Sequence, residues 1–503
     1  MKILQRLTLA LLLGLAVAAL GACSDDAPGG NDVQGTQLRL RIAVPSSSSR
    51  AYAEGYGSEE GTDNENAIDN LTIYFYRGID GPNADAAFTN VVFVTSELFT
   101  TEPEGAGTYG CTIPLAFAPQ AGDRIAVLVN MDYPAGIETM ADLRALTARG
   151  WVAGKRLSES SHFAMSSALA DDGIVEASPS ADNIWQAEVT VERLAARIDL
   201  WFDPSNISPT GDALLYTTTD GGSQVEVTDV LPVNVNSRNT WALKHFTTEA
   251  DPDNLGNTVV CSREYLGADG LPSVYVVEPH TAVKGTASAD LDYLYGDTRA
   301  SRMESDYLSL FAAGNGSIKG FLADAALMHN TTGRFSRALT IAYANENTQT
   351  VEAMTADYMT GFVLRARFMP GAVTGADGEP VDYTPGSDFV RCRTAEGKDF
   401  YFADMAAFNA WHAANGTAVA DVALYPGGVC YYTVWLNHRL DELTGAETGY
   451  RMQYATVRNH IYRMGFTFGG PGYVRPTLDE PYNVRAIIYA RKWNFRRLSQ
   501  IIV

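Results

Sequence analysis

The side chains that most often carry out chemistry are scattered along this 503-residue chain. No HExxH, GxSxG, P-loop or Rossmann glycine pattern occurs. The glycine-rich stretch GNGSIKG (314–320) lacks the GK[ST] ending that would cradle a phosphate, so we interpret it as a loop. The seven histidines show no spacing typical of metal ligands. The sequence therefore predicts a protein that is not an enzyme and needs no metal or cofactor.

Cysteine is the remaining reactive residue type. No CxxC pair occurs, which argues against a zinc site. Apart from Cys23, the thiols could form two disulfides or remain as isolated buried groups, and the sequence leaves both open. These four residues are Cys111, Cys261, Cys392 and Cys430.

The N-terminus has the features of an export signal. Lys2 and Arg6 precede an apolar run over 7–20 that is too short to cross a bilayer, and small residues follow it. The order Leu-Gly-Ala-Cys at its end resembles a lipobox, in which Cys23 is acylated and becomes the first residue. Two acyl chains hold a protein on a membrane. We therefore expect a lipoprotein signal peptide over 1–22 and a lipid on Cys23.

Composition limits the remaining function classes. The formal net charge is −22, and 46% of the residues are hydrophobic. Phosphate binding requires clustered Lys and Arg, and no such cluster occurs, so we expect no nucleic-acid partner. The length suffices for two or three domains with their own cores.

A regular strand is expected directly after a Gly- and Asp-rich tether. Apolar residues alternate there with Gln37, Arg39, Arg41 and Ala43, which is the period of a half-buried strand. Its apolar positions are Leu38, Leu40, Ile42 and Val44.

A serine tract follows this strand and ends at Arg50. Residues 46–66 contain almost no apolar side chains, so cleavage between Arg50 and Ala51 is sterically plausible. The strand would then be held only noncovalently, and its loss would leave an apolar groove with open backbone edges. Such a groove accepts a strand from another chain. The alternative is an ordinary strand followed by a loop in which Arg50 has no role.

Strands dominate the rest of the sequence. Short alternating segments separated by turn residues predict antiparallel sandwiches, with helices expected over 139–150 and 404–416. The best domain boundary is DPSNISPTGD, residues 203–212.

Several segments, taken in order, resemble the fimbrillins of Bacteroidota type V pili, and more closely their short (minor) branch. Besides the lipobox, the first strand and Arg50, these segments are ENAIDNLTIYFY (65–76), VERLAARIDLWF (191–202), VYVVEP (274–279), GKDFYFADMAAF (397–408), CYYTVWLNH (430–438) and YATVRNHIYRM (454–464).

The resemblance implies a mainly β fold of two transthyretin-like antiparallel β-sandwich domains with a few helical insertions. It divides the chain into a signal peptide (1–22), a tether and first strand removed on maturation (23–50), an N-terminal domain (51–205) and a C-terminal domain (206–503).

The resemblance also implies a maturation route and partners. The precursor would reach the cell surface on the outer membrane through its lipid, an arginine-specific protease would cut after Arg50, and subunits would polymerise head to tail, supporting adhesion. The donor strand would come from the C-terminal end, with candidate residues Val484, Ala486, Ile488, Leu498, Ile501 and Val503.

Two other roles remain open. The chain could be a fimbrial tip or anchor subunit, or a monomeric surface lipoprotein that binds glycan or host protein and keeps its first strand.

Overall fold

The computed structural model describes most of the chain. The described residues are 35–43, 58–77, 85–96, 100–103, 108–151, 157–167, 173–177, 183–248, 258–259, 274–285, 293–294, 304–331, 335–438, 453–478 and 482–494. The predicted sites at Cys23, Val44, Arg50, Ala51, Leu498, Ile501 and Val503, and also Cys261, lie outside them.

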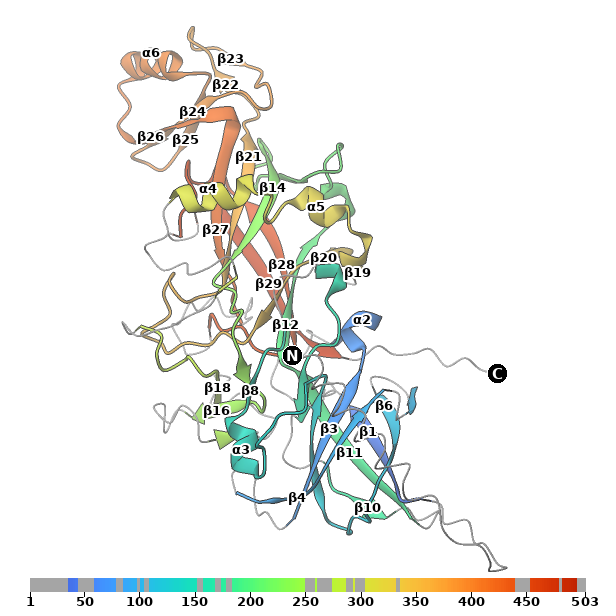
Figure 1. Cartoon of the computed structure of the whole chain (residues 1–503). Coiled ribbons are helices and arrows are strands. Elements are labelled where there is room, and N and C mark those ends of the chain that lie inside the picture. The colour runs from blue at the N-terminus through green and yellow to red at the C-terminus, as the bar shows by residue number, and fades with distance from the viewer. Residues whose placement is uncertain are drawn as a thin grey trace, which may run out of the picture.

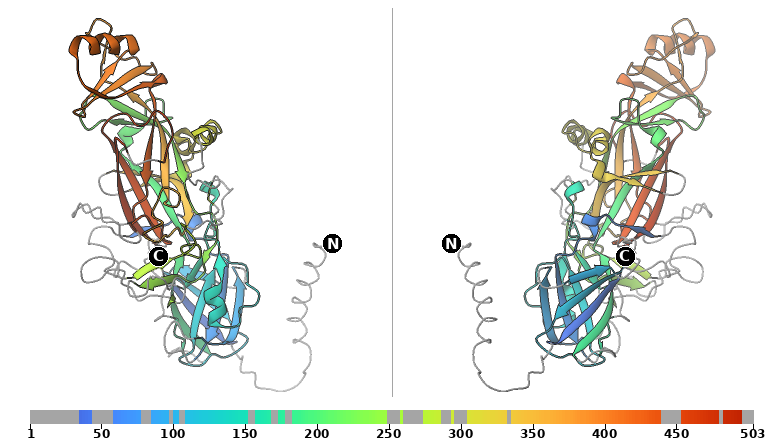
Figure 2. Two further views of the ribbon diagram at one scale, coloured as in Figure 1. Left: turned by 90° about the vertical axis from the view of Figure 1, so that its left-hand side faces the viewer. Right: turned by 90° about the vertical axis from the view of Figure 1, so that its right-hand side faces the viewer.

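The molecule is mainly β, as predicted, and its β regions are stacked along one long axis (Figures 1 and 2). At one end lies a nine-stranded sheet in the order β4-β3-β7-β9-β11-β1-β6-β5, with β10 beside β11. We call this region the lower sandwich. Its strands are β1 (Gln37–Ala43), β3 (Asn70–Tyr76), β4 (Phe88–Thr95), β5 (Thr100–Pro103), β6 (Thr108–Pro114), β7 (Arg124–Val129), β9 (Met165–Ser167), β10 (Glu176–Ala177) and β11 (Ile184–Arg193).

One apolar core fills the lower sandwich. Leu40 of β1, Ile73 of β3 and Val127 of β7 belong to the same buried cluster. Because β1 and β3 are separated by several strands within the sheet, the sheet must fold over itself to bring them together. β1 is therefore part of the interior of this region.

The middle of the molecule is a second sandwich, here called the upper sandwich. It pairs a six-stranded sheet, β19-β20-β12-β28-β29-β2, with a four-stranded sheet, β13-β14-β21-β27, around the largest buried cluster. The strands are β2 (Ser58–Glu60), β12 (Ala195–Phe202), β13 (Leu214–Thr217), β14 (Gln224–Val233), β19 (Met328–Asn330), β20 (Arg337–Asn345), β21 (Gly361–Met369), β27 (Val429–Trp435), β28 (His460–Phe468) and β29 (Val484–Asn494).

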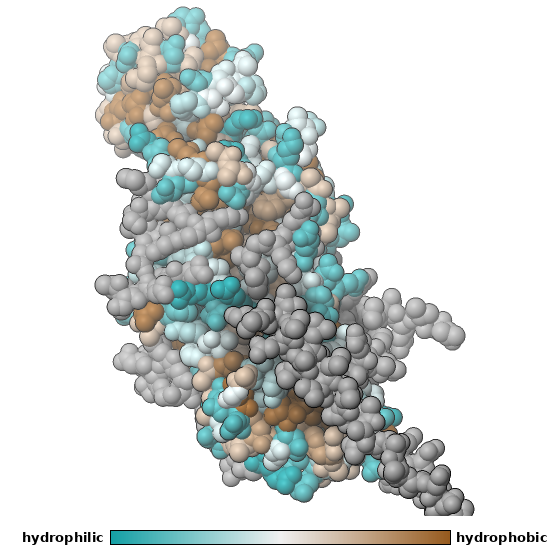
Figure 3. Space-filling view, in the orientation of Figure 1, coloured by the Kyte–Doolittle hydropathy of each residue, from teal (hydrophilic) through white to brown (hydrophobic). Residues whose placement is uncertain are grey.

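A five-stranded sheet, β23-β22-β25-β24-β26, extends from the far end of the upper sandwich and carries α6 (Figure 1). Its strands are β22 (Val373–Thr374), β23 (Pro380–Val381), β24 (Phe389–Thr394), β25 (Asp399–Phe402) and β26 (Val419–Tyr425). Figure 3 shows apolar surface at this end, where Val381, Met405 and Leu424 are exposed.

Two smaller sheets, β15-β8 and β17-β16-β18, complete the strand pairing of the described residues. These strands are β8 (Thr147–Ala148), β15 (Thr240–Trp241), β16 (His245–Thr248), β17 (Thr258–Val259) and β18 (Val274–Val277). The helices are α2 (Asp63–Asn66), α3 (Met140–Ala145), α4 (Glu304–Ala312), α5 (Ile318–Leu322) and α6 (Met405–Asn415), with short 3-10 turns η1 (Leu157–Glu159), η2 (Pro204–Asn206), η3 (Ala325–Leu327) and η4 (Pro426–Gly428).

Both predicted helices form. Asp404 caps α6 by accepting from the backbone N–H of Ala407, and Gly416 ends it with φ 59°, a conformation that glycine adopts without strain. Thr139 caps α3, but this helix ends after Ala145, earlier than expected. Among the described helices, none is long and apolar enough to span a membrane.

The passage between the sandwiches differs from the predicted boundary between residues 205 and 206. The predicted N-terminal domain (51–205) includes the segment 191–202, yet β11 lies in the lower sandwich while β12 pairs with β20 and β28 in the upper one. β2, placed by the prediction in the first domain, pairs with β29. Strand-like sequence alone cannot reveal this, because sheet membership depends on partners far away in the chain.

Candidate functional site

β1 occupies a slot between two other strands of the lower sandwich. It runs parallel to β11 and antiparallel to β6, and both ladders extend over all seven residues, Gln37 to Ala43. Leu40, for example, stands opposite Ala187 on one side and Cys111 on the other. β1 is thus an interior strand of the sheet. Because β1 and β11 are parallel, no hairpin can join them.

The two faces of β1 have opposite environments. Leu38, Leu40 and Ile42 are 0%, 1% and 0% exposed, whereas the side chains of Arg39 and Arg41 are exposed. A guanidinium nitrogen of Arg41 lies 3.3 Å from a carboxylate oxygen of Glu188, and both side chains are largely solvated. Exposed pairs of this kind contribute little, so burial of the three apolar side chains holds the strand.

The walls of the slot come from β6 and β11. Cys111 and Ile113 on one side, and Ala187 and Val189 on the other, belong to the same buried cluster as the apolar face of β1. Without β1, these walls would meet water, and the facing backbone groups of β6 and β11 would lose their ladder partners. A strand of similar pattern could restore both the hydrogen bonds and the burial.

Three of the candidate donor residues lie in β29, within the upper sandwich. β29 pairs with β28 from Val484 opposite Phe468 to Lys492 opposite His460. Ile488 is buried in the main core, and Val484 and Ala486 pack against it. These residues therefore complete the molecule's own sheet, while the later candidates lie outside the described residues.

A buried polar cluster anchors the segment that follows the predicted cleavage site. The Arg197 guanidinium of β12 lies 3.0 Å from the Glu65 carboxylate of α2, 3.0 Å from that of Glu59 in β2 and 3.1 Å from that of Asp199. Arg463 of β28 also contacts Glu59. The hydroxyl of Tyr343 donates to Glu65 at 2.7 Å. Side chains from 58–66 thus fasten this segment to the upper sandwich.

Burial and charge act against each other in this cluster. Burial raises the pKa of Glu65, but the neighbouring Arg197 and the hydrogen bonds from Thr62 and Tyr343 together lower it by more. The net pKa therefore lies below the ordinary value. The Asp199 pKa is likewise lowered, because the attraction of Arg197 outweighs the effect of burial. The carboxylates are therefore ionised at neutral pH and hold the arginine as ion pairs.

This cluster was not identified from the sequence. One local signal was present, since Thr62 and Glu65 form a capping box that begins α2. The partners of Glu65 come from strands far along the chain, and no sequence spacing indicates them.

Other polar and reactive side chains are buried away from the slot. Arg458 is fully buried and binds both carboxylate oxygens of Glu346, at 2.8 and 2.6 Å, so its role is structural. Cys111, Cys392 and Cys430 are buried free thiols. No disulfide therefore joins any two of these three cysteines.

Comparison with known proteins identifies a related class over part of the chain. Residues 423–487 match the family model described as the major fimbrial subunit protein type IV, fimbrillin, C-terminal. This range covers β27, β28 and the start of β29. The match confirms the resemblance to fimbrillins over these residues.

Particular solved structures are similar at low sequence identity. A fimbrilin (fimA) from Porphyromonas gingivalis W83 shares 14% identity with a TM-score of 0.39, covering 92% of this chain and 99% of that one. The tip fimbrial protein Mfa3 from Porphyromonas gingivalis shares 9% identity with a TM-score of 0.37, covering 91% and 100%. No curated protein matches the chain.

Proposed function

We propose that this protein is a structural subunit of a surface fimbria that matures by losing β1 and polymerises by strand exchange. The precursor is exported as a lipoprotein acylated at Cys23 and carried to the outer membrane. An arginine-specific protease then cuts between Arg50 and Ala51. The resulting head-to-tail polymer supports adhesion.

The observation that supports this proposal most directly is the position of β1. An N-terminal strand that completes an interior position of the sheet, with Leu38, Leu40 and Ile42 buried, is the element whose removal would open a binding slot. The chain is anchored again from Ser58 onward by the polar cluster of the upper sandwich. Cutting at Arg50 would therefore release β1 without releasing the remainder of the N-terminal segment.

Cleavage alone would not expel the strand. Burial of each of its three apolar side chains is worth about 1.5–3 kcal/mol, and two full ladders add to this. A competing strand must displace β1, so assembly is expected to proceed by exchange between subunits and to be slow in the absence of a donor.

The donor is most simply the chain beyond β29. Val484, Ala486 and Ile488 contribute to their own sheet, and withdrawing them would cost the upper sandwich a strand. Leu498, Ile501 and Val503 follow β29 in the chain, so inserting them would leave the pairing of β29 with β28 in place. Because a heterologous contact between a C-terminal tail and a neighbour's slot does not close on itself, it propagates as a fibre.

The test is to compare the wild-type precursor with Arg50→Ala after treatment with an arginine-specific protease. Wild type should give a new N-terminus at Ala51 and ladders of polymer on unheated gels, with fibres in electron micrographs. Arg50→Ala should remain a folded monomer. Arg41→Ala is the matched control, because Arg41 lies within a paired strand and its removal should leave cleavage and assembly unchanged.

Polymers formed by Arg50→Ala would contradict the processing step. Cleavage at Ala51 without polymers, even with donor-competent subunits added, would contradict the stalk role and indicate a tip subunit. Surface protein that keeps a lipid on Cys23 and an intact β1 would instead indicate an anchor or a monomeric binder.

A further inference from the structure

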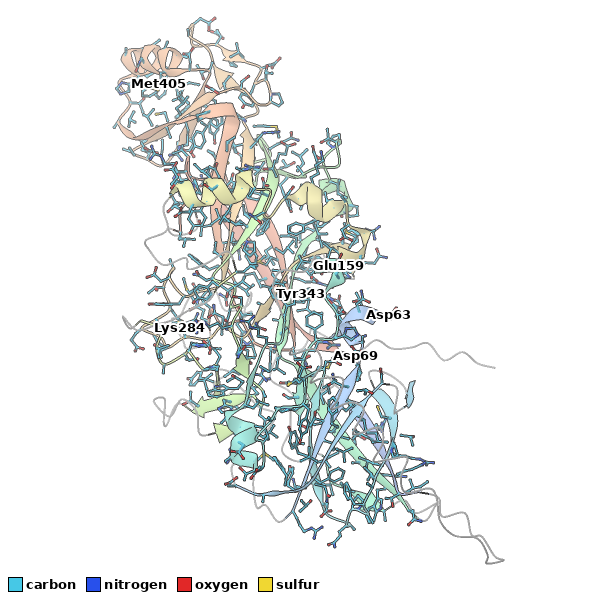
Figure 4. The ribbon with its side chains drawn as sticks, in the orientation of Figure 1. Asp63, Asp69, Glu159, Lys284, Tyr343 and Met405 are labelled. Carbon is cyan, nitrogen blue, oxygen red and sulfur yellow. The ribbon has the colours of Figure 1, made fainter. Side chains whose placement is uncertain are left out.

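A buried lysine, amide and carboxylate meet at the flank of the upper sandwich, about midway along the molecule, where Lys284 is labelled in Figure 4. Lys284 Nζ lies 2.6 Å from the side-chain oxygen of Asn347 and 2.6 Å from a carboxylate oxygen of Glu278. Glu278 directly follows β18, and Asn347 lies just after β20. The lysine and the asparagine are 63 residues apart in the chain.

The three side chains are almost completely excluded from water. Lys284, Glu278 and Asn347 are 4%, 2% and 0% exposed. The third contact of Lys284 Nζ is the backbone carbonyl of Thr348, at 2.6 Å. In such a site an amine and an amide can remain in contact indefinitely, which gives a slow reaction the effective concentration that it lacks in solution.

The orientation of the Asn347 amide is fixed by its hydrogen bonds. Its Nδ2 donates to the carbonyls of Asn234 and Tyr358 at 3.0 and 2.8 Å, and to the hydroxyl of Thr360 at 2.8 Å. All three partners are acceptors, so the NH2 group must face them and the carbonyl oxygen must face Lys284. The amide is thus held with its carbonyl group toward the amine.

The turn that carries Glu278 and Lys284 is equally constrained. The backbone N–H of Glu278 donates to the hydroxyls of Thr281 and Thr348 at 2.9 and 3.1 Å. These two hydroxyls are 2.6 Å apart. His280 also contacts the Glu278 carboxylate, through its backbone N–H at 2.7 Å and its ring nitrogen at 3.0 Å. The carboxylate and the amine therefore have little freedom to move away from the amide.

We infer that Lys284 and Asn347 form an intramolecular isopeptide bond, with Glu278 as the group that transfers the proton. Glu278 accepts one proton from the lysine ammonium, which frees the lone pair on Nζ. Nζ attacks Cγ of Asn347, the Nζ–Cγ bond forms and the Cγ–Nδ2 bond breaks. Nζ gives up a second proton as the new amide forms, and the departing NH2 group takes up both protons, through Glu278, and leaves as ammonium. An ammonium side chain and an amide thus yield a new amide and one ammonium ion.

The electrostatics of the site agree with this assignment. Burial lowers the pKa of the Lys284 ammonium below its ordinary value, although the nearby Glu278 carboxylate opposes the change. Burial raises the pKa of Glu278, but Lys284 and His280 together bring it below the ordinary value. Glu278 is thus ionised and able to accept a proton, and the lysine is easier to deprotonate than one in water.

The bond would join two parts of the molecule. β18 belongs to the small sheet β17-β16-β18, whereas β20 belongs to the upper sandwich. A covalent link between the turn after β18 and the loop after β20 would prevent these parts from separating under tension. The bond would form whether or not Arg50 is cleaved and β1 is lost.

The experiment is mass spectrometry of the purified full chain after tryptic digestion. Trypsin cuts after free lysine, so an unreacted chain yields separate peptides on either side of Lys284. The cross-linked chain should instead yield one branched product of residues 264–299 and 338–365. Its mass should be lower than the sum of the two peptides by about 17 Da, the mass of the ammonia lost in acyl transfer to an amine nucleophile.

Variants test each role. Lys284→Arg keeps a cation but lacks the nucleophile, so no branched product should form. Glu278→Gln should abolish or strongly slow the reaction. Asn347→Asp should still cross-link, now with loss of about 18 Da as water, because the leaving group has changed. Thermal unfolding of each variant checks that it is folded.

A wild-type digest with cleavage after Lys284 and no branched product would overturn the inference and leave the group as a buried ion pair. This result is decisive even if a variant fails to fold, because it requires only the native chain. A branched product in Glu278→Gln at the wild-type rate would overturn the role of the carboxylate.

Discussion

Leu40→Ala should strongly weaken the hold of β1 on its slot. Leu40 is 1% exposed and lies at the centre of the strand, opposite Cys111 and Ala187. Truncating a buried leucine costs about 2–5 kcal/mol. In the intact precursor this loss should appear as a lower free energy of unfolding of the lower sandwich, measured by denaturant titration.

The same substitution has a second, sharper readout after cleavage. Because about 1.4 kcal/mol corresponds to a tenfold change in binding, the β1 peptide should dissociate roughly 30- to 5,000-fold more readily when it carries Leu40→Ala. The assay follows a fluorescent peptide of residues 37–44 leaving cleaved protein in the presence of unlabelled competitor. The side chain of Arg41 is exposed, so Arg41→Ala should change affinity by no more than about 1 kcal/mol. Equal release of the Leu40→Ala and Arg41→Ala peptides would refute the view that the buried face holds the strand.

Three further outcomes are expected. Glu65→Gln removes a carboxylate from a buried ion pair and should lower the free energy of unfolding at pH 7 by about 3–5 kcal/mol. Because the folded pKa of Glu65 lies below its ordinary value of 4.5, this stabilisation is present above that pH and is lost as the pH falls through the folded pKa. The unfolding free energies of variant and wild type should therefore converge as the pH is lowered. Burial raises the pKa of Cys430 to about 11, so iodoacetamide at pH 8 should label this thiol only after unfolding, and labelling of the native protein would contradict its burial. Gly316 has φ 75°, and a Cβ there would lie 2.4 Å from the carbonyl oxygen of Val230. Gly316→Ala should therefore lower the free energy of unfolding, measured with denaturant, by at least about 1–2 kcal/mol. Gly314→Ala should cost less, because φ is 81° there but the surrounding space is open.

Local patterns predicted the elements that depend on local energetics. The alternation over 37–43 predicted a strand with one buried face, and the structure contains it. Asp404 and Gly416 predicted a helix because one satisfies the first backbone N–H groups and the other tolerates a left-handed conformation. Each of these signals acts within a few residues, so the sequence contains all of the relevant information.

The candidate sites were predictable only in part. The burial of Leu38, Leu40 and Ile42 follows from period-2 alternation, whereas the parallel pairing of β1 with β11 does not. The sequence does not predict the contact of Lys284 with Asn347 either, because the two residues approach only when the turn after β18 packs against the loop after β20. Such contacts depend on tertiary packing of segments that are distant in the chain.

By itself, the sequence determined a mainly β chain and a first strand with one apolar face, because composition and side-chain period are local properties. Only the tertiary structure decided that β1 lies inside a sheet, that β12 belongs to the upper sandwich and that Glu65 pairs with Arg197. Backbone hydrogen bonds between strands are nearly the same for every sequence. The choice of partner is therefore set by burial and by charge compensation across the whole fold.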